Sequence, residues 1–536
     1  MRTQLAAFRA DKRGNFGILS AIMAVPLVMS AGLALDLSTI SRTRAELQSA
    51  MDAAALAVAR EGKDISDAQA KDIADRFLDD NFNPAYTKLS VVRDGTAFKV
   101  TADTKANLAF GALFGYDDWD VGAASTADLA YADYEIALVL DTTGSMAGGK
   151  LQSMKDAVIG MIETMELQVK HEENLKFAMV PFATYVNVGA GFGPSFDKDG
   201  KQVKGTGAAW LDLEGKATMP QSELDTGASR FQLYNNFGVA WPGCVETRYG
   251  KTYATDDTAA DVGNPETLFV PAFAIDEPDK GFSNSYLKSS AKPNVKTKDE
   301  QEKRWAKYGV KVDASGKPEK GGLLNELLVP ITELLFGKGK AKKIRYDGTD
   351  GKGPDNGCDV QPISPLNSDY DTLVKKVKSL QANGTTNIME GVAWGLRVLS
   401  PGEPFTETMS AKHDVERVMV VLTDGSNVFG NSGNALGSSY SSFGYLVDGR
   451  LGITGGGAGA TNALMNERTL AACTNAKEQG ITVYTIRLEE PNVATGEMLK
   501  QCATDEAHYF DVPSRKQLDD AFAKIGERIV KVRLAS

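Results

Sequence analysis

The stretch that decides the fold is YEIALVLDTTGSMAGGKLQSM, residues 134–154. It opens with almost continuous apolar residues, which is typical of a strand in a parallel sheet covered on both faces. A run rich in glycine and hydroxyl side chains follows at 142–149. From Leu151 onward apolar residues return at three- and four-residue spacing, which predicts a helix. The stretch therefore predicts a strand, a polar turn and a helix, the repeating unit of an α/β sheet.

The same alternation continues through the C-terminal part of the chain. We expect further strands at 175–186, 415–424, 481–488 and 508–512. We expect helices at 150–167, 368–381, 388–399, 460–480 and 513–532. Alternating strands and helices specify a doubly wound, Rossmann-like α/β domain with helices on both faces of its sheet. We assign this domain to residues 132–187 and 367–536.

Residues 188–366 interrupt the alternation. They are rich in Gly, Pro, Asp and Lys, with isolated aromatic residues and little periodicity. The stretch is too long for an ordinary loop, so we interpret it as an insertion with structure of its own. Its Asp-Gly clusters at 195–201 and 346–357 lack the terminal Glu of a calcium-binding loop. We therefore expect ordinary turns there.

The N-terminal segment decides the compartment. Residues 16–35 are twenty uncharged residues, the length that crosses a bilayer core of about 30 Å. Arg2, Arg9, Lys12 and Arg13 precede them and predict a cytoplasmic tail at 1–15 and a body outside the cytoplasm. A cleaved signal peptide is the alternative, with a small-x-small site at 32–34. The length of the run, and helical spacing that continues past it, favour a retained single-pass anchor.

Residues 36–131 suggest a small module just outside the membrane. Leu47, Met51, Ala54, Ala55 and Val58 fall on one face of a helix that continues from the apolar run. A second helix is expected at 65–80, and alternating segments between 88 and 131 predict short strands joined by tight turns. We expect a helix followed by a small antiparallel sheet.

Composition excludes several classes of function. The formal net charge is −11 and the pI about 5.1, which argues against a nucleic-acid binder. Three scattered histidines argue against a histidine-built zinc site. The four cysteines form no C-x-x-C pair, so zinc-ribbon and thioredoxin-like sites have no support. On nearness in the chain we expect disulfides Cys473–Cys502 and Cys244–Cys358, with four free thiols as the alternative.

The candidate site is a set of oxygen-bearing side chains in three loops that we place at strand ends. Ligands of open α/β sheets bind outside the carboxyl ends of the strands. Two carboxylates and three hydroxyls make an all-oxygen shell suited to Mg²⁺, with Mn²⁺ or Ca²⁺ possible. Such a shell leaves room for a carboxylate from a partner. The five residues are Asp141, Thr143, Ser145, Thr386 and Asp424.

These loops have two other interpretations. Thr and Ser near a strand–helix junction are common helix caps, and Asp424-Gly425 alone could be a turn. Residues 144–150 have the spacing of a phosphate-binding P-loop, but Leu151 stands where that motif needs Ser or Thr, so we expect no nucleotide. Familiar motifs of hydrolases and metalloproteases are absent from the sequence, and we expect no enzymatic activity.

The three loops resemble the von Willebrand factor type A domain. D-x-T-x-S at 141–145, G-x-T at 384–386 and T-D-G at 423–425 are similar to the elements of its metal-ion-dependent adhesion site. The resemblance implies that Thr143, Ser145 and Thr386 contact the metal directly. It implies that Asp141 and Asp424 mostly orient waters and hydroxyls. The family more often has Ser at the position of Thr143, and the hydroxyl is kept here.

The N-terminus resembles TadG-like (TadE/TadG-like) proteins of the bacterial Tad (Flp) pilus-assembly system. The specific part is the apolar helix running into LQSAMDAAALA, residues 47–57. Further likeness lies in WPGCVETR (241–248), LFVPAFAIDEPD (268–279) and NSYL (284–287). Prepilin-like relatives are cut after a Gly with Glu five residues on, whereas Gly14 is followed there by Leu19. The resemblance implies an inner-membrane protein with a periplasmic body that takes part in pilus assembly.

The resulting hypothesis is an anchored domain that binds a carboxylate-bearing protein, expected among the other Tad pilus components, through its metal site. The rival hypothesis is a purely structural pilus component, or a surface adhesin, with a vestigial metal site.

Overall fold

A computed structural model describes most of the chain, in segments separated by short gaps and one long one. The described residues are 15–61, 65–94, 97–128, 133–169, 174–224, 227–277, 284–287, 304–312, 318–323, 352–408, 415–430 and 436–529. The chain divides into two compact units, with the boundary between Tyr131 and Ala132.

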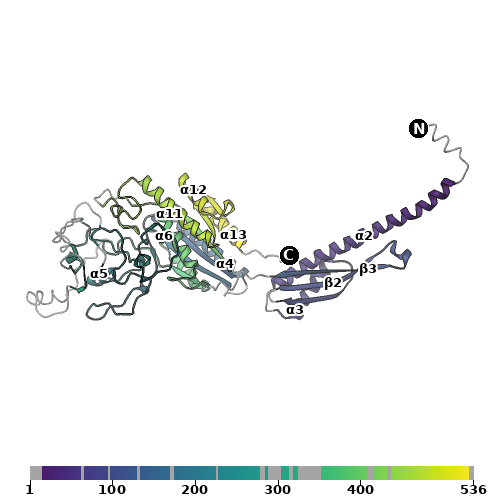
Figure 1. The fold of residues 1–536 in the computed structure, drawn as a ribbon, viewed down its shortest axis with the longest axis horizontal. Coiled ribbons are helices and arrows are strands. Elements are labelled where there is room, and N and C mark those ends of the chain that lie inside the picture. Colours follow the sequence, from purple (N-terminus) through teal and green to yellow (C-terminus); the bar gives the residue numbers. More distant parts are fainter. Residues whose placement is uncertain are drawn as a thin grey trace, which may run out of the picture. The chain divides into compact units, whose positions relative to one another are not determined.

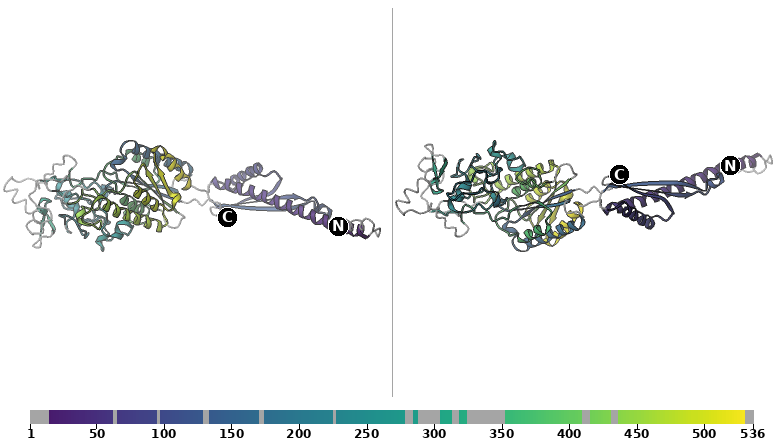
Figure 2. Two further views of the ribbon diagram at one scale, coloured as in Figure 1. Left: turned by 90° about the horizontal axis from the view of Figure 1, so that it is seen from above. Right: turned by 90° about the horizontal axis from the view of Figure 1, so that it is seen from below.

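The first unit is a long helix on a small antiparallel sheet. Its elements are α2 (Asn15–Arg60), α3 (Asp67–Asn81), β1 (Tyr86–Asp94), β2 (Ala97–Asn107) and β3 (Asp118–Asp128), with strand order β1-β2-β3. Ser66 and Gln69 form a capping box that starts α3. The face of α2 predicted from its periodicity is buried in the unit's core, together with Phe98 and Val100 of β2. Figures 1 and 2 show α2 lying along the small sheet. The predicted helix and antiparallel sheet are thus confirmed.

The N-terminal half of α2 is apolar and exposed. Among the described residues one helix is long and apolar enough to cross a membrane, by length and composition alone. Leu19, Ile22, Leu27 and Val28 each expose more than half of their surface. Pro26 lies inside the helix, which membrane helices tolerate. Helical structure continues through residue 35 without a break, as the sequence predicted.

The second unit is built on a six-stranded sheet of order β10-β5-β4-β11-β12-β13. Its strands are β4 (Asp133–Asp141), β5 (Leu175–Phe182), β10 (Ser364–Asn367), β11 (Val415–Thr423), β12 (Thr482–Leu488) and β13 (Tyr509–Val512). All pair in parallel except β10, which runs antiparallel to β5 at the edge. The α/β class is confirmed. The sequence did not predict β10. The sheet therefore begins its edge strand at residue 364, inside the range 188–366 that the sequence assigned to the insertion.

Helices cover both faces of this sheet. Alternate residues of β4 point to opposite faces: Ile136, Leu138 and Leu140 to one core, Ala137 and Val139 to the other. The first core is closed by α4 (Gly149–Gln168), α9 (Tyr370–Ser379) and α13 (Leu518–Ile529). The second is closed by α10 (Ile388–Leu399), α11 (Ala458–Glu478) and α12 (Val493–Cys502). The two helical layers can be followed in Figure 2.

The described part of 188–366 packs on the α10 face and shares its core. It contributes Trp210, Phe231, Trp241, Phe269 and Trp305, which lie in one cluster with Trp394 of α10. Its short elements are α5 (Arg230–Phe237), α6 (Lys251–Thr255), β7 (Cys244–Val245), which pairs with β6 (Val186–Asn187), and the pair β8 (Val310–Val312) and β9 (Pro318–Leu323). The described part of the insertion therefore contributes to the domain's hydrophobic core.

Both expected disulfides are present, Cys244–Cys358 and Cys473–Cys502. The Asp-Gly cluster at 195–201 forms a turn, in which Asp197 accepts hydrogen bonds from the backbone N–H groups of Asp199 and Lys201, both at 2.9 Å. In the second cluster, residues 346–351 lie outside the described residues.

Candidate metal centre

The candidate site lies at the point where the chain changes direction across the sheet. From β4 the chain proceeds to β5 and β10 on one side, and later to β11, β12 and β13 on the other. β4 and β11 are parallel neighbours, with Leu140 opposite Leu422, so their carboxyl ends lie side by side. Asp141 ends β4 and Asp424 directly follows β11. Such a switch point is where open α/β sheets bind ligands.

Asp141 is fully buried and shapes the loop that follows it. Its carboxylate accepts hydrogen bonds from the backbone N–H of Thr143 at 2.8 Å and from the Thr423 hydroxyl at 2.6 Å. Burial raises the pKa of Asp141 to about 6, and the negative charge of Asp424 adds to the rise, while the bonds from Thr143 and Thr423 oppose it. With both oxygens engaged, Asp141 is placed to orient other groups.

The three hydroxyls form a continuous chain that ends on Asp424. Thr386 Oγ1 donates to Thr143 Oγ1 at 3.3 Å, and Thr143 Oγ1 lies 3.0 Å from Ser145 Oγ. Ser145 Oγ donates to Asp424 Oδ1 at 2.6 Å. Thr143, Thr386 and Asp424 are buried, whereas Ser145 is exposed and opens the chain to solvent. The structure therefore brings all five sequence-predicted residues into one cluster.

The loop that carries Thr386 is not a strand-end loop, and that part of our interpretation was wrong. Thr386 lies between α9 and α10. The loop is fastened to the end of β4 by backbone hydrogen bonds, from Gly144 N to Gly384 O at 3.0 Å and from Asn383 N to Thr142 O at 2.8 Å. These bonds bring a helix–helix connection to the carboxyl edge of the sheet.

Gly425 leaves space beside the hydroxyls. A Cβ built on Gly425 would lie 3.2 Å from Thr386 Oγ1 and 3.6 Å from Ser145 Oγ. A larger residue would therefore crowd the Thr386 hydroxyl and contact that of Ser145. The glycine in the sequence T-D-G is therefore explained by space.

The oxygen spacing fits a hexacoordinate Mg²⁺ ion. Mg–O distances of about 2.0–2.1 Å in an octahedron place neighbouring oxygens about 2.9 Å apart. The two printed separations between hydroxyl oxygens, Thr386 to Thr143 at 3.3 Å and Thr143 to Ser145 at 3.0 Å, lie close to that value and are also hydrogen-bond distances. Oxygen donors alone are also what a hard dication prefers. Among the described residues, no three His, Cys, Asp or Glu side chains converge so that they could hold a metal ion, so the candidate centre depends on its hydroxyl oxygens.

A lysine that the sequence interpretation missed completes the cluster. Lys150 Nζ, near the start of α4, donates to Asp424 Oδ2 at 2.7 Å. The Asp424 side chain is inaccessible to solvent, and that of Lys150 is 21% exposed. In the sequence, Lys150 is marked only by the P-loop spacing of residues 144–150. Its ammonium group instead neutralises one of the two site carboxylates.

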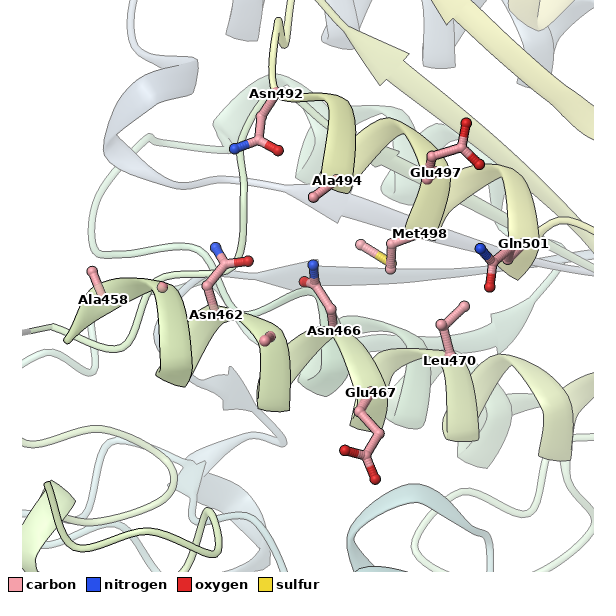
Figure 3. A pocket seen from close by; sticks show the side chains of 12 residues that line it. Ala458, Asn462, Asn466, Glu467, Leu470, Asn492, Ala494, Glu497, Met498 and Gln501 are labelled. Atoms are coloured by element: carbon pink, nitrogen blue, oxygen red, sulfur yellow. The ribbon is translucent and has the colours of Figure 1, made fainter. Parts of the chain in front are cut away.

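Asn427 connects the site to a groove on the α11–α12 side. Its Oδ1 accepts from Ile388 N at 2.8 Å, at the first turn of α10, and its Nδ2 donates to Asn466 Oδ1 at 2.8 Å. Asn466 lines a groove of about 790 Å³ between α11 and α12, with Leu470 and Met498 among its apolar residues (Figure 3). The sequence interpretation identified neither Asn427 nor the groove.

A comparison with protein families matches the N-terminal helix. Residues 14–61 match the family described as putative Flp pilus-assembly TadE/G-like. This match confirms the N-terminal resemblance seen in the sequence. No curated protein matches the chain.

Solved structures similar to this chain include pilus proteins. The pilus adhesin SpaC from Lactobacillus rhamnosus GG is 10% identical, with 84% of this chain and 35% of SpaC covered and a TM-score of 0.32. The vWF domain of the type V pili tip protein Mfa5 from Porphyromonas gingivalis is 10% identical, covering 76% and 98%, with a TM-score of 0.32. A von Willebrand factor type A protein from Catenulispora acidiphila is 10% identical, covering 83% and 49%, with a TM-score of 0.25. The fold assignment itself rests on the strand order described above.

Proposed function

We propose that this protein is a non-enzymatic, membrane-anchored component of Tad (Flp) pilus assembly that binds a partner protein through one divalent metal ion. The observation that carries the metal-binding part is the convergence of three hydroxyls and two carboxylates at the switch point of the sheet, with hydroxyl separations that an octahedral shell accommodates. The family match at 14–61 supports the pilus-assembly setting.

The side chains divide the work at the site. Thr143, Ser145 and Thr386 would contact the ion through their hydroxyl oxygens. Asp141 and Asp424 would hold those hydroxyls and bound waters in place, since both carboxylates already accept hydrogen bonds within the cluster. Mg²⁺, or Mn²⁺ or Ca²⁺, would supply a positive centre at which a partner carboxylate binds.

The charge of the cluster favours an acidic group on the partner. The two carboxylates balance a dication, so Lys150 leaves the loaded site with an excess positive charge. An Asp or Glu of the partner that completes the coordination shell would neutralise this excess. An uncharged or basic group would not.

The compartment follows from the first unit and the disulfides. Residues 16–35 would cross the inner membrane once, with the N-terminus in the cytoplasm and the body in the periplasm. Two disulfides suit an oxidising compartment. The uninterrupted packing of α2 onto its sheet supports a retained anchor, because the apolar run and the packed face belong to one helix.

Partner capture tests this function. Full-length wild-type protein in detergent should retain other Tad components in Mg²⁺ and release them in chelator. Ser145→Ala removes an exposed hydroxyl of the cluster and should lose the Mg²⁺-dependent fraction. Ser379→Ala, at the exposed end of α9, is the matched control and should behave as wild type. Capture that ignores chelator and Ser145→Ala would refute metal-dependent binding.

One observation favours the rival function, a structural component with a vestigial site. The ammonium group of Lys150 already pairs with Asp424, so that carboxylate is satisfied without a metal. On this hypothesis piliation would be lost on deletion of residues 1–131 and kept in Asp141→Asn.

A further inference from the structure

The loop between β2 and β3 presents a concentrated apolar surface. Residues 108–116, LAFGALFGY, carry no charge. Three large side chains of this loop and one at the start of β3 are at least half exposed: Leu113 (73%), Phe114 (50%), Tyr116 (61%) and Trp119 (53%). We call these four side chains the hairpin tip. Elsewhere in the described sheet and α3 of this unit, only Phe77 and Val92 are comparably exposed, so the tip is a patch and not general surface character.

The loop is fastened to α2 at a defined height. The Asp36 carboxylate accepts hydrogen bonds from the backbone N–H groups of Ala109, Phe110 and Gly111 at 2.8, 3.0 and 2.7 Å. One helical turn earlier, a Cβ built on Gly32 would lie 2.3 Å from the Phe110 ring, so this loop packs directly on the helix there. Figure 1 shows the β2–β3 hairpin running along α2.

This height coincides with the end of the apolar run. Gly32 belongs to the uncharged residues 16–35, and Asp36 is the first charged residue after them. Asp36 is only 5% exposed, because the loop backbone covers it. Its negative charge is met by three N–H groups, so no free carboxylate faces outward where α2 would leave the bilayer. Leu33 and Leu35, in the last apolar turn of α2, are exposed as well, and the β2–β3 loop packs on that turn at Gly32.

We propose that the hairpin tip inserts into the lipid interface on the side where α2 leaves the membrane, as a second membrane contact of the first unit. This rests on the proposed anchor at 16–35. Leu113 and Phe114, at the end of the loop, enter the acyl-chain boundary. Tyr116 and Trp119 lie at the headgroup level, where Tyr and Trp are enriched in membrane proteins. Two contacts fix the orientation of the module on the membrane, which a single helix does not.

The charges beside the tip define the lipid. Asp117, Asp118 and Asp120 flank Trp119; Lys105 pairs with Asp118 at 2.9 Å, and Lys105 and Lys88 also interact electrostatically with Asp120. The exposed Asp117 carboxylate is repelled by an anionic surface. The tip therefore fits a bilayer of zwitterionic headgroups, such as phosphatidylcholine or phosphatidylethanolamine.

Tryptophan quenching in vesicles tests the insertion. Of the five tryptophans, only Trp119 is exposed; Trp210, Trp241, Trp305 and Trp394 are buried in the second unit. The full chain is reconstituted into phosphatidylcholine vesicles with brominated acyl chains, and Trp119→Phe defines the Trp119 part of the emission. We expect most of that emission to be lost in brominated vesicles and kept in unbrominated ones. Trp119→Phe should show no bromine-dependent loss.

Tip variants sharpen the test. Leu113→Asn with Phe114→Asn removes apolar surface that is already exposed, so the fold is kept and the quenching of Trp119 should fall. Val92→Asn, an equally exposed apolar residue on β1, is the matched control and should leave quenching unchanged. Added anionic lipid should reduce the quenching.

The outcomes separate the tip from the anchor. Protein that floats with the vesicles while Trp119 stays unquenched overturns the insertion and leaves the anchor standing. Protein that does not float overturns both. A third outcome is that brominated lipids do not quench Trp119, while aqueous quenchers fail to reach it only at a high protein-to-lipid ratio. In that case a second copy of the chain covers the tip, and the proposal is wrong.

Discussion

Replacing Lys150 by Met tests how charge is balanced at the metal centre. The ammonium group lies 2.7 Å from Asp424 Oδ2, and the carboxylate side chain is inaccessible to solvent. At an effective dielectric constant of about 20 the attraction at this distance is about 6 kcal/mol before desolvation is counted. Removing one partner of a buried pair typically costs about 3–5 kcal/mol, because the remaining charge is left uncompensated.

The cost should depend on the metal. In chelator, Lys150→Met should lower the free energy of unfolding by about 3–5 kcal/mol. In saturating Mg²⁺ the ion supplies the missing positive charge, and we expect a loss of about 1 kcal/mol from altered packing. The difference between these two losses of stability equals the gain in the free energy of Mg²⁺ binding by the variant, so the Mg²⁺ affinity of Lys150→Met should be about 100-fold higher than that of wild type. Binding of the acidic partner at saturating Mg²⁺ should weaken, because the loaded site loses its excess positive charge.

Chemical denaturation in chelator and in Mg²⁺, with calorimetric Mg²⁺ titration, measures both quantities on the full chain. Lys155→Met, one turn further along α4, is the matched control and should leave Mg²⁺ affinity unchanged. Equal destabilisation of Lys150→Met with and without Mg²⁺, together with unchanged affinity, would refute the reasoning.

Three further predictions concern other parts of the molecule. Gly425→Ala should block Mg²⁺ binding, because the added Cβ would lie against Thr386 and Ser145, and should change the free energy of unfolding by only about 1 kcal/mol. A metal titration and a melting curve check the two expectations. Unchanged Mg²⁺ affinity would show that the metal does not need the space beside Gly425. Burial opposes ionisation of Glu246, but Arg230 and Arg450 outweigh this effect and lower the pKa of the Glu246 carboxyl below the usual 4.5. The ionised carboxylate therefore stabilises the fold above pH 4.5, and this stabilisation is lost as the pH falls through the pKa of the folded state. Glu246→Gln should therefore lower the free energy of unfolding by about 3–5 kcal/mol at pH 7. Denaturant titrations should show a smaller difference between variant and wild type at pH 3.5 than at pH 7. An equal difference at both pH values would contradict the pairing of Glu246 with the two arginines. Asp36→Ala should leave three N–H groups of the β2–β3 loop without their acceptor, so amide hydrogen exchange at residues 109–111 should accelerate. Asp118→Ala is the control: it breaks an exposed ion pair and should leave exchange at 109–111 unchanged.

The regular elements of the second unit could be predicted because their periodicity is local. The apolar strand at 134–141 and the helix at 388–399 carry their pattern within a few turns of chain, and both formed with nearly those bounds. By contrast, α12 is only ten residues long, and its buried face includes Thr495 and Gly496, so apolar periodicity does not mark it. Strand β10 is four residues long and contains a proline, which edge strands tolerate but which hides a strand in the sequence.

The site was partly predictable because its chemistry follows the strand ends. Asp141 and Asp424 end neighbouring parallel strands, and sequence order alone made their meeting plausible. The place of Lys150 in the site could not be predicted from the sequence. Its ammonium group bonds Asp424, which is 274 positions away in the chain, and the two residues meet only after β4 and β11 have paired. The loop of Thr386 was misplaced for a similar reason: its fastening to β4 uses backbone atoms, which leave no mark in the sequence.

The aromatic residues of 188–366 show the same limit. Trp210, Trp241 and Trp305 are isolated in sequence, and each reaches the core from an irregular segment. Segments such as WPGCVETR, which supported the family resemblance, prove to be packing elements. Glu246 of that segment pairs with two buried arginines, and Thr247 donates a hydrogen bond to Glu390 of α10.

Calorimetric titration of the full chain with Mg²⁺ tests the central claim most directly. Wild-type protein should bind one ion per chain. Thr386→Val, which removes one hydroxyl of the cluster at constant shape, should abolish the binding heat. Thr385→Val should not, because the neighbouring hydroxyl faces Thr184 instead. Absence of saturable binding of Mg²⁺, Mn²⁺ and Ca²⁺ by the wild type, or equal binding by Thr386→Val, would contradict the assignment of these residues as a metal centre.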